Sequence, residues 1–250
     1  MYKRQHLEQR GNEQTIMLGF SDGTKDGGYL QANWSIFKTK EKLSLLCKEY
    51  NIKVIFFDGR GGPPARGGGK AHRFYASQTD RIANHAIQLT IQGQTITSKY
   101  GTTEHFINNC EQLITAGLSH SLFENENIIS EEYRDIIEQL ANISYKKYQA
   151  LKNHKMFIAY LENKSTLKYY GQTNIGSRPD KRGNKRKLDL KDLRAIPFVG
   201  SWSQLKQNVP GYFGMGTAIK NLMDDNKLDS MKRLFIEVPF FKALILNSMM

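Results

Sequence analysis

The sequence predicts an α/β protein in which helices predominate. Two short apolar runs, Thr15–Phe20 and Lys53–Phe57, have the length and composition of buried strands. A helical pattern over Tyr29–Tyr50 separates them, and a glycine-containing loop follows each strand. This succession of strand, loop, helix and strand is typical of parallel α/β units. Long helical patterns occupy most of the sequence that follows.

The later elements are predicted from periodicity and capping. Between residues 88 and 99 apolar side chains alternate around Gly93, which predicts another strand or a hairpin. Glu104–Leu122 has apolar residues at helical spacing. Ser130 is a favourable N-cap, and the helix that it opens has glutamates in its first turn and an apolar face that continues to Leu151. These apolar stripes indicate core packing rather than a cofactor site.

Length, charge and cysteine content limit the class of protein. A chain of 250 residues can bury one sizeable core or be a piece of a larger protein. The net charge of +12 leaves anionic substrates, nucleic acid and acidic partners open. Cys47 and Cys110 lack a Cys-x-x-Cys spacing and fit buried, reduced thiols. No apolar run approaches a membrane span, and residues 1–14 are too polar for a signal peptide, so we expect a cytoplasmic protein without membrane contact.

A glycine-rich loop carries the strongest chemical signal. Residues 58–70 read Asp-Gly-Arg-Gly-Gly-Pro-Pro-Ala-Arg-Gly-Gly-Gly-Lys and follow the second strand, where α/β enzymes build their active sites. Glycines let backbone amides approach a ligand, and the guanidinium groups of Arg60 and Arg66 match phosphate or carboxylate geometry. The loop therefore predicts a site for a small anion. A purely structural loop is the alternative, while the flanking apolar sequence argues against a disordered RNA-binding tail.

Two nucleotide-binding loops do not fit this segment. A phosphate-binding loop needs Ser or Thr after Gly-Lys, but Ala71 follows Lys70. The dinucleotide fingerprint fails because Pro64 stands where its third glycine belongs. Farther along, Arg178 and Arg194 lie among small or apolar neighbours, a setting in which an arginine usually has a fixed anionic partner.

Four segments resemble the signature motifs of the phosphoenolpyruvate carboxylases, in the order of that family. They are Met17–Asp26 (Met-Leu-Gly-Phe-Ser-Asp-Gly-Thr-Lys-Asp), the glycine loop Gly59–Gly69, Gly176–Arg182 (Gly-Ser-Arg-Pro-Asp-Lys-Arg) and Leu193–Phe198 (Leu-Arg-Ala-Ile-Pro-Phe), the last followed by Trp202, Gln204 and Gly214-x-Gly216-x-Ala218. Four such motifs in order are highly specific. The chain is therefore similar to the C-terminal catalytic portion of the family, without its N-terminal part and extreme C-terminus.

The resemblance implies a lyase that makes oxaloacetate and phosphate from phosphoenolpyruvate and bicarbonate, with Mg²⁺ or Mn²⁺ and without biotin. In that family bicarbonate attacks the phosphoryl group to give carboxyphosphate and pyruvate enolate. Carbon dioxide released from the carboxyphosphate is then captured by the enolate. Such chemistry needs a hard divalent ion and several arginines to neutralise phosphate, carboxylate and enolate charge.

The motifs also imply roles for individual residues. Asp22 matches the family's metal ligand, Lys25 a lysine near bicarbonate and phosphate, and Arg66 the loop arginine that closes over the reacting groups. The implied substrate-binding residues are Arg60, Arg178, Arg194, Gly61, Gly67 and Gly68. Two other interpretations stay open, namely Asp22 as a helix N-cap and Arg194 as a member of a structural ion pair.

Asp58 departs from the family, which usually has histidine before Gly-Arg-Gly-Gly. A carboxylate cannot donate a hydrogen bond as an imidazole does. We expect Asp58 to act in the catalytic site by pairing with an arginine or aiding the metal. The departure also suggests an alternative, a homologue that keeps the fold without activity. A nucleic-acid-binding module using residues 60–73 and 178–191 is less favoured, because few aromatic residues interleave with the basic ones.

The family's fold is an eight-stranded parallel barrel with many outer helices, usually assembled as a tetramer. Residues 1–250 would form a single partial domain, in which 15–100 supply the last barrel strands and the glycine loop and 101–250 a mainly helical portion. The family's metal-binding glutamate and proton-handling histidine would precede residue 1. An incomplete barrel leaves strand edges uncovered, so we expect a fragment that is marginally stable or associates. Its own carboxylase activity should be weak or absent.

Overall fold

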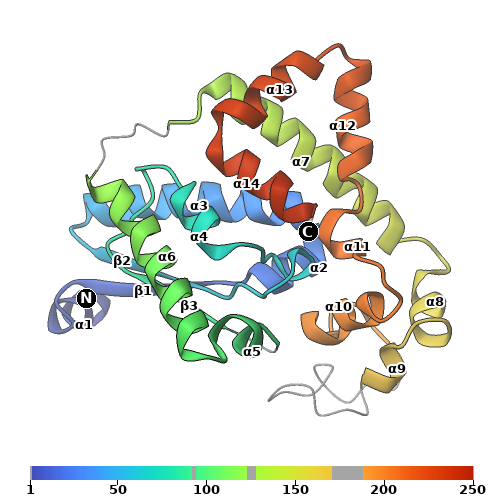
Figure 1. The fold of residues 1–250 in the computed structure, drawn as a ribbon, viewed down its shortest axis with the longest axis horizontal. Helices are drawn as coiled ribbons and strands as arrows, with labels where there is room; N and C mark the ends of the chain where they lie inside the picture. Colours follow the sequence, from blue (N-terminus) through green and yellow to red (C-terminus); the bar gives the residue numbers. More distant parts are fainter. Residues whose placement is uncertain (1, 92–93, 123–127, 171–187, 250) are drawn as a thin grey trace.

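The computed structural model describes residues 2–91, 94–122, 128–170 and 188–249, which form a small parallel sheet surrounded by helices (Figure 1). The strands β1 (Glu13–Leu18), β2 (Lys53–Asp58) and β3 (Ile87–Leu89) lie in the order β1-β2-β3. Leu18 pairs with Asp58, and Asp58 pairs with Leu89. The three strands therefore end at the same level, and the loops that follow them start from one edge of the sheet.

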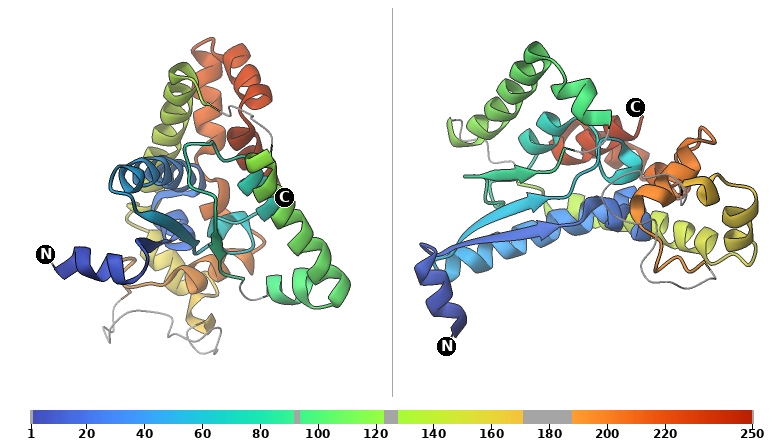
Figure 2. Two further views of the ribbon diagram at one scale, coloured as in Figure 1. Left: turned by 90° about the vertical axis from the view of Figure 1, so that its left-hand side faces the viewer. Right: turned by 90° about the horizontal axis from the view of Figure 1, so that it is seen from below.

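Helices make up most of the remaining described chain. The first half contains α1 (Tyr2–Gln9), α2 (Phe20–Gly27), α3 (Tyr29–Glu49), the 3₁₀ turn η1 (Pro64–Arg66), α4 (Ala71–Ala76), α5 (Gln94–Tyr100) and α6 (Thr103–Leu122). The second half contains α7 (Glu131–Lys152), α8 (Phe157–Asn163), α9 (Leu167–Tyr170), α10 (Ala195–Ser203), α11 (Val209–Tyr212), α12 (Met215–Asp224), α13 (Leu228–Glu237) and α14 (Pro239–Ser248). Both views of Figure 2 place α3 and α6 on opposite sides of the sheet. Within the described ranges, no helix is both long enough and apolar enough to cross a membrane.

Most predicted elements are confirmed. The apolar runs form β1 and β2, and the helical patterns form α3, α6 and α7. Ser130 caps α7 as predicted, because its Oγ accepts a hydrogen bond of 3.3 Å from the backbone N–H of Tyr133.

One prediction is only partly confirmed, and one alternative interpretation is excluded. The strand predicted within residues 88–99 is present only at its start, where β3 spans Ile87–Leu89, whereas Gln94–Tyr100 forms α5. Alternating apolar side chains favoured a strand, but α5 packs against α6, and packing of this kind overrides local preference. Asp22 is not an N-cap, since it lies in the first turn of α2 and Gly19 occupies the cap position.

The described strands do not close into a barrel. β1 pairs only with β2 among these strands. Met17, on β1, keeps 63% of its surface exposed. The helical character and the parallel sheet are thus observed, whereas membership of this sheet in a larger barrel stays a prediction.

A cluster of aromatic side chains connects α3 and α4 to the last helix. Phe74 of α4 and Phe37 of α3 both contact Phe240 of α14, and the Phe37 and Phe240 ring centroids lie 4.1 Å apart. Trp34 of α3 stacks on Phe37 in the same cluster. Burial of these large side chains fixes α14 against the helices that carry the loop after β2.

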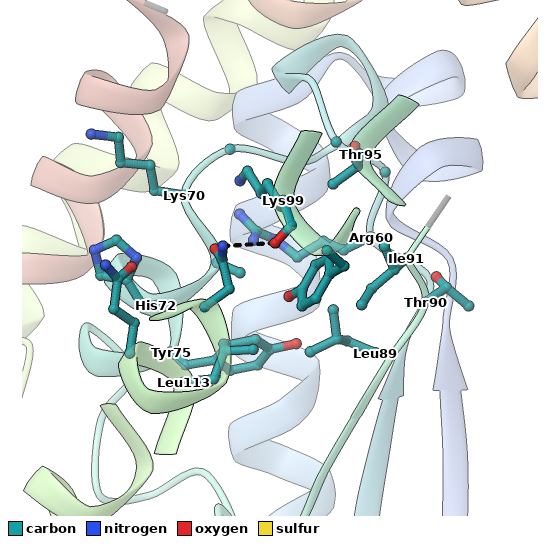
Figure 3. A pocket seen from close by; sticks show the side chains of 17 residues that line it. Arg60, Lys70, His72, Tyr75, Leu89, Thr90, Ile91, Thr95, Lys99 and Leu113 are labelled. Atoms are coloured by element: carbon teal, nitrogen blue, oxygen red, sulfur yellow. Dashed lines mark hydrogen bonds between the residues drawn. The ribbon is translucent and has the colours of Figure 1, made fainter. Parts of the chain in front are cut away.

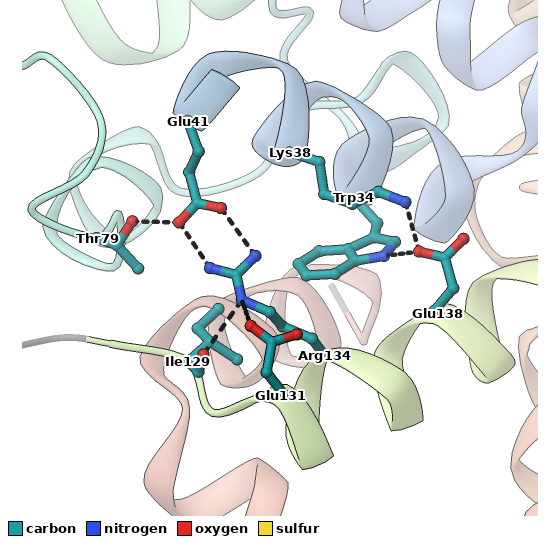
Figure 4. A network of polar contacts seen from close by, with 8 residues as sticks. All are labelled: Trp34, Lys38, Glu41, Thr79, Ile129, Glu131, Arg134 and Glu138. Atoms are coloured by element: carbon teal, nitrogen blue, oxygen red, sulfur yellow. Dashed lines mark hydrogen bonds and ion pairs between the residues drawn. The ribbon is translucent and has the colours of Figure 1, made fainter. Parts of the chain in front are cut away.

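Polar contacts fix α3 against α7 (Figure 4). Arg134 of α7 donates two hydrogen bonds of 2.8 Å to the carboxylate of Glu41 on α3, which also accepts one of 2.8 Å from Thr79 Oγ1. One turn away along the interface, Glu138 accepts from Trp34 Nε1 at 2.6 Å and from Lys38. These contacts hold α3, whose inner face supports the candidate site.

Candidate functional site

The glycine loop after β2 is a compact turn held by its own backbone. Gly68 N–H donates to the Pro63 carbonyl at 2.9 Å, and Gly69 N–H donates to the Gly62 carbonyl at 2.8 Å. The N–H groups of Gly61 and Gly67 also donate within the loop, to Arg66 and Pro64. The amides of the predicted ligand-binding glycines Gly61, Gly67 and Gly68 are therefore engaged inside the loop.

The glycines are required for space. A Cβ on Gly68 would lie 2.0 Å from the Gly61 carbonyl oxygen, and one on Gly61 would lie 2.4 Å from Arg66 Cβ. Gly67 has φ +73°, a left-handed conformation that side chains disfavour. The loop can close this tightly only because these positions lack side chains.

Neighbouring helices fix the loop in place. Ser21 of α2 donates its hydroxyl to the Arg66 carbonyl at 3.1 Å. At the other end of the loop, the Lys70 N–H donates to Asn247 Oδ1 of α14 at 3.0 Å. The same asparagine side chain fills the space beside Gly69. Residues far apart in the sequence thus determine the position of the loop.

Asp58, at the end of β2, is fully buried and forms an ion pair with Lys40 of α3. Its Oδ2 lies 2.6 Å from Lys40 Nζ and accepts a hydrogen bond of 2.9 Å from Tyr75 OH. Burial lowers the pKa of Lys40, while the charge of Asp58 acts in the opposite direction. The expected pairing of Asp58 with an arginine is replaced by this pairing with a lysine.

Arg60 is buried with a guanidinium group that is only partly engaged. Its Cζ lies 4.0 Å from the centroid of Phe74 and 5.9 Å from that of Phe20, so aromatic faces contact the cation. Its Nε and Nη2 have no hydrogen-bond partner among the described residues. Burial lowers the pKa of Arg60, although an arginine stays protonated in proteins. A buried, protonated group with vacant donors favours an anionic ligand.

A cavity of about 220 Å³ adjoins Arg60 (Figure 3). It lies among the glycine loop, the end of β3, and the helices α4, α5 and α6, and its basic side chains are Arg60, Lys70, His72 and Lys99. No aspartate or glutamate belongs to the described lining. Burial and the charges of Arg60 and Lys70 lower the pKa of Lys99. Burial and the charges of Arg73, Lys70 and Lys99 lower the pKa of His72. The cavity is therefore suited to a small anion.

The other predicted site residues gather on a different side of the loop. Lys25 is buried in α2 and donates to the carbonyl groups of Leu193 at 2.8 Å and Leu190 at 3.2 Å. Arg66 lies near Asp22, whose charge raises the pKa of Arg66 while burial, the larger effect, lowers it.

Arg194, half-buried, occupies the N-cap position of α10 without a capping hydrogen bond from its side chain, and α10 packs against α2 and η1. No ion pair of Arg194 occurs within the described part of the chain. None of Asp22, Lys25, Arg66 and Arg194 lines the Arg60 cavity. Arg178 and its Gly-Ser-Arg-Pro motif lie outside the described residues.

Residues 1–250 match the family described as phosphoenolpyruvate carboxylase over their whole length. The chain belongs to the phosphoenolpyruvate carboxylase family. It is 36% identical over 254 residues to the phosphoenolpyruvate carboxylase of Corynebacterium diphtheriae, covering 98% of this chain and 28% of that protein. The phosphoenolpyruvate carboxylases of Corynebacterium efficiens and Corynebacterium glutamicum are each 36% identical over 251 residues, covering 98% of this chain and 27% of theirs. The chain thus spans little more than a quarter of these carboxylases.

A metal site for a carboxylase is incomplete in this part of the chain. Asp22 is exposed at the carboxyl end of β1, where its carboxylate is available to a cation. No group of three His, Cys, Asp or Glu side chains able to hold a metal occurs among the residues that the structure describes. Mg²⁺ is often bound by one or two carboxylates together with water and substrate phosphate. Asp22 fits as one ligand of such a site.

Several residues of the candidate site were not predicted. Lys70, His72 and Lys99 line the cavity, and Lys40 and Tyr75 hold Asp58. The sequence held one usable signal: Lys40 falls in the apolar stripe of α3, between Phe37 and Cys47 at helical spacing. A lysine on a buried helix face requires a buried acidic partner.

Proposed function

We propose that this chain is the phosphate-binding portion of a phosphoenolpyruvate carboxylase. The complete enzyme would convert phosphoenolpyruvate and bicarbonate to oxaloacetate and phosphate through carboxyphosphate and pyruvate enolate. Membership of the family and the names of the relatives support this proposal. The proposal is made for the assembled enzyme, because the chain spans 28% of its relative's length.

The vacant donors of Arg60 carry the proposal. The guanidinium group of Arg60 is buried beside a cavity, and the titratable side chains that line this cavity are either basic or tyrosine. A phosphate or carboxylate of phosphoenolpyruvate would satisfy these donors and reduce the repulsion between Arg60, Lys70 and Lys99. Arg60 would therefore bind the anionic end of the substrate, with the two lysines assisting.

The second group of residues would act on the other reactants. Lys25 and Arg66 would contact bicarbonate or the transferred phosphate, and Arg178 and Arg194 would hold the enolate. Asp22 would contribute one ligand to Mg²⁺ or Mn²⁺, which supplies charge neutralisation when bound. No biotin would be required. Lys25 bonds to the segment before α10, and Arg66 lies against α2, so movement of that segment and of α2 would bring them toward the substrate.

The three-stranded sheet would be part of a larger barrel, with residues 15–100 supplying its last strands and residues 101–250 the helical surround. The complete enzyme would assemble as a cytoplasmic tetramer. Among the described strands β1 pairs on one side only, which supports the idea of further strands. By itself the chain should have weak or no carboxylase activity, since Asp22 is the one metal ligand that it is proposed to supply.

Calorimetric titration of phosphoenolpyruvate into the chain with Mn²⁺ tests the proposal. We expect saturable binding that Arg60→Ala abolishes. Arg73→Ala is the matched control, because this arginine is exposed on α4 and does not line the cavity. Binding that survives in Arg60→Ala, or that falls equally in both variants, would contradict the proposed role of Arg60. A folded chain that binds no phosphoenolpyruvate would favour a homologue that keeps the fold without this function.

A further inference from the structure

Three charged side chains lie buried together behind the cavity. Asp58, Lys40 and Arg60 each expose 5% of their surface or less. Asp58 is the last residue of β2 and Arg60 follows two residues later, and the charge of Asp58 acts to raise the pKa of Arg60. Since this group holds two positive charges and one negative charge, only one of its two cations can be neutralised internally.

Within this group, the carboxylate of Asp58 pairs with Lys40. Asp58 Oδ2 receives the Lys40 ammonium group at 2.6 Å and the Tyr75 hydroxyl at 2.9 Å. The other oxygen, Oδ1, has no hydrogen-bond partner among the described residues. Arg60 therefore makes no hydrogen bond to Asp58 Oδ1, and Arg60 Nε and Nη2 have no partner among the described residues.

An aromatic enclosure keeps Lys40 in this arrangement. Its Nζ lies 5.2 to 5.9 Å from the ring centroids of Phe20, Phe56, Phe74 and Tyr75. Phe74 contacts both cations, because the Arg60 guanidinium lies 4.0 Å from the centroid of the same ring. Lys40 and Arg60 therefore occupy adjoining positions around one ring, and Lys40 is the cation that reaches the carboxylate.

We infer that Lys40 is a positioning residue for Arg60: by neutralising Asp58, it prevents a buried Asp58–Arg60 ion pair and keeps the guanidinium group available to an anion in the cavity. Lys40 itself is absent from the cavity lining. The inference rests on the proposed function of Arg60. It accounts for a carboxylate beside an anion site, where the family usually has histidine, because the lysine cancels the unfavourable charge.

Two single variants and the double variant distinguish a positioning role of Lys40 toward Arg60 from a contribution of Lys40 to stability alone. Lys40→Met leaves Asp58 buried without its cation, and Arg60 is the buried cation two residues along the chain that would replace it. Asp58→Asn leaves Lys40 unpaired but gives Arg60 no carboxylate to bind. Both changes destabilise the fold, because each leaves a buried charge uncompensated. Only Lys40→Met should remove Arg60 from the cavity.

The first measurement is phosphoenolpyruvate affinity with Mn²⁺, determined by calorimetry on each folded variant. We expect a loss of about tenfold or more in Lys40→Met and a loss of about threefold or less in Asp58→Asn. In the double variant Lys40→Met/Asp58→Asn, affinity should return to within about threefold of the unmodified chain, because neither charge remains. Equal losses in the two single variants would overturn the inference. If Lys40→Met does not fold, Lys40→Gln replaces it, since an amide can donate to Asp58 without neutralising it.

The second measurement requires no ligand. The Nε–Hε resonance of Arg60 is assigned by its disappearance in Arg60→Lys and compared among the variants. It should shift in Lys40→Met and return in the double variant. An unchanged resonance in Lys40→Met would overturn the inference even if phosphoenolpyruvate binds. If the unmodified chain binds no phosphoenolpyruvate, the proposed function fails, and the resonance still decides whether Lys40 positions Arg60.

Discussion

Gly68→Ala should disrupt the glycine loop through a clash that the backbone cannot avoid. The new Cβ would lie 2.0 Å from the Gly61 oxygen and 2.3 Å from the Gly62 oxygen, whereas ordinary contact begins at 3.4 Å. These oxygens belong to the main chain, so no side-chain rotation relieves the overlap. The loop must open, and the hydrogen bonds from Gly68 to Pro63 and from Gly69 to Gly62 lengthen or break.

The cost follows from these contacts. A backbone hydrogen bond contributes a net ~1 kcal/mol, and forcing atoms into a packed site costs ~1–3 kcal/mol. Loss of the two bonds of Gly68 and Gly69, together with partly relieved overlap, predicts a decrease of about 3 kcal/mol in the free energy of unfolding. Affinity for phosphoenolpyruvate should fall as well, because the loop carries Arg60.

Urea unfolding followed by circular dichroism measures this change, and calorimetry measures the affinity. Gly117→Ala is the matched control, since a Cβ at this position in α6 meets nothing within 4 Å. Alanine favours the helix there and should stabilise the chain by ~0.5–1 kcal/mol. A Gly68→Ala chain as stable as the unmodified one would refute the reasoning, because the loop would then not close as described.

Three further outcomes are expected. Sulfate should bind more tightly as the pH falls below about 6.5. The pKa of His72 is lowered in the free chain, and a bound anion raises this pKa because it favours the imidazolium. Sulfate is chosen because its own charge does not change near this pH. Calorimetry at several pH values should lose this dependence in His72→Gln, and a dependence that persists would exclude His72 as its source. Arg134→Met should lower the free energy of unfolding by ~2–3 kcal/mol, because it leaves the nearly buried Glu41 carboxylate without its cation. Urea unfolding measures this change. An unchanged free energy of unfolding would contradict the importance of this ion pair between α3 and α7. Asp58→His should fold poorly by itself and recover its melting temperature with Lys40→Gln, since a buried imidazole tolerates a neutral neighbour better than an ammonium group; recovery without the second change would disprove that explanation.

Local features were accessible from the sequence. Ser130 begins α7 because its hydroxyl accepts a hydrogen bond only three residues along the chain. The apolar runs of β1 and β2 and the helical periodicity of α3 likewise depend on neighbouring residues. The position of Arg60 at the end of a strand was predictable for the same reason. Residues 94–100 were not, because their packing against α6 determined that they form a helix.

The functional environment of Arg60 depends on contacts between distant segments. Lys40 reaches Asp58 from α3, and Asn247 of α14 supports the loop at Lys70 from the other end of the chain. The family motifs identified Arg60, and they marked Asp58 as a departure from the usual histidine. They did not indicate which cation Asp58 neutralises. Electrostatic interaction and packing depend on distances in space, so only the tertiary structure decided that Lys40 pairs with Asp58 and that Arg60 lies beside the cavity with Nε and Nη2 unbonded among the described residues.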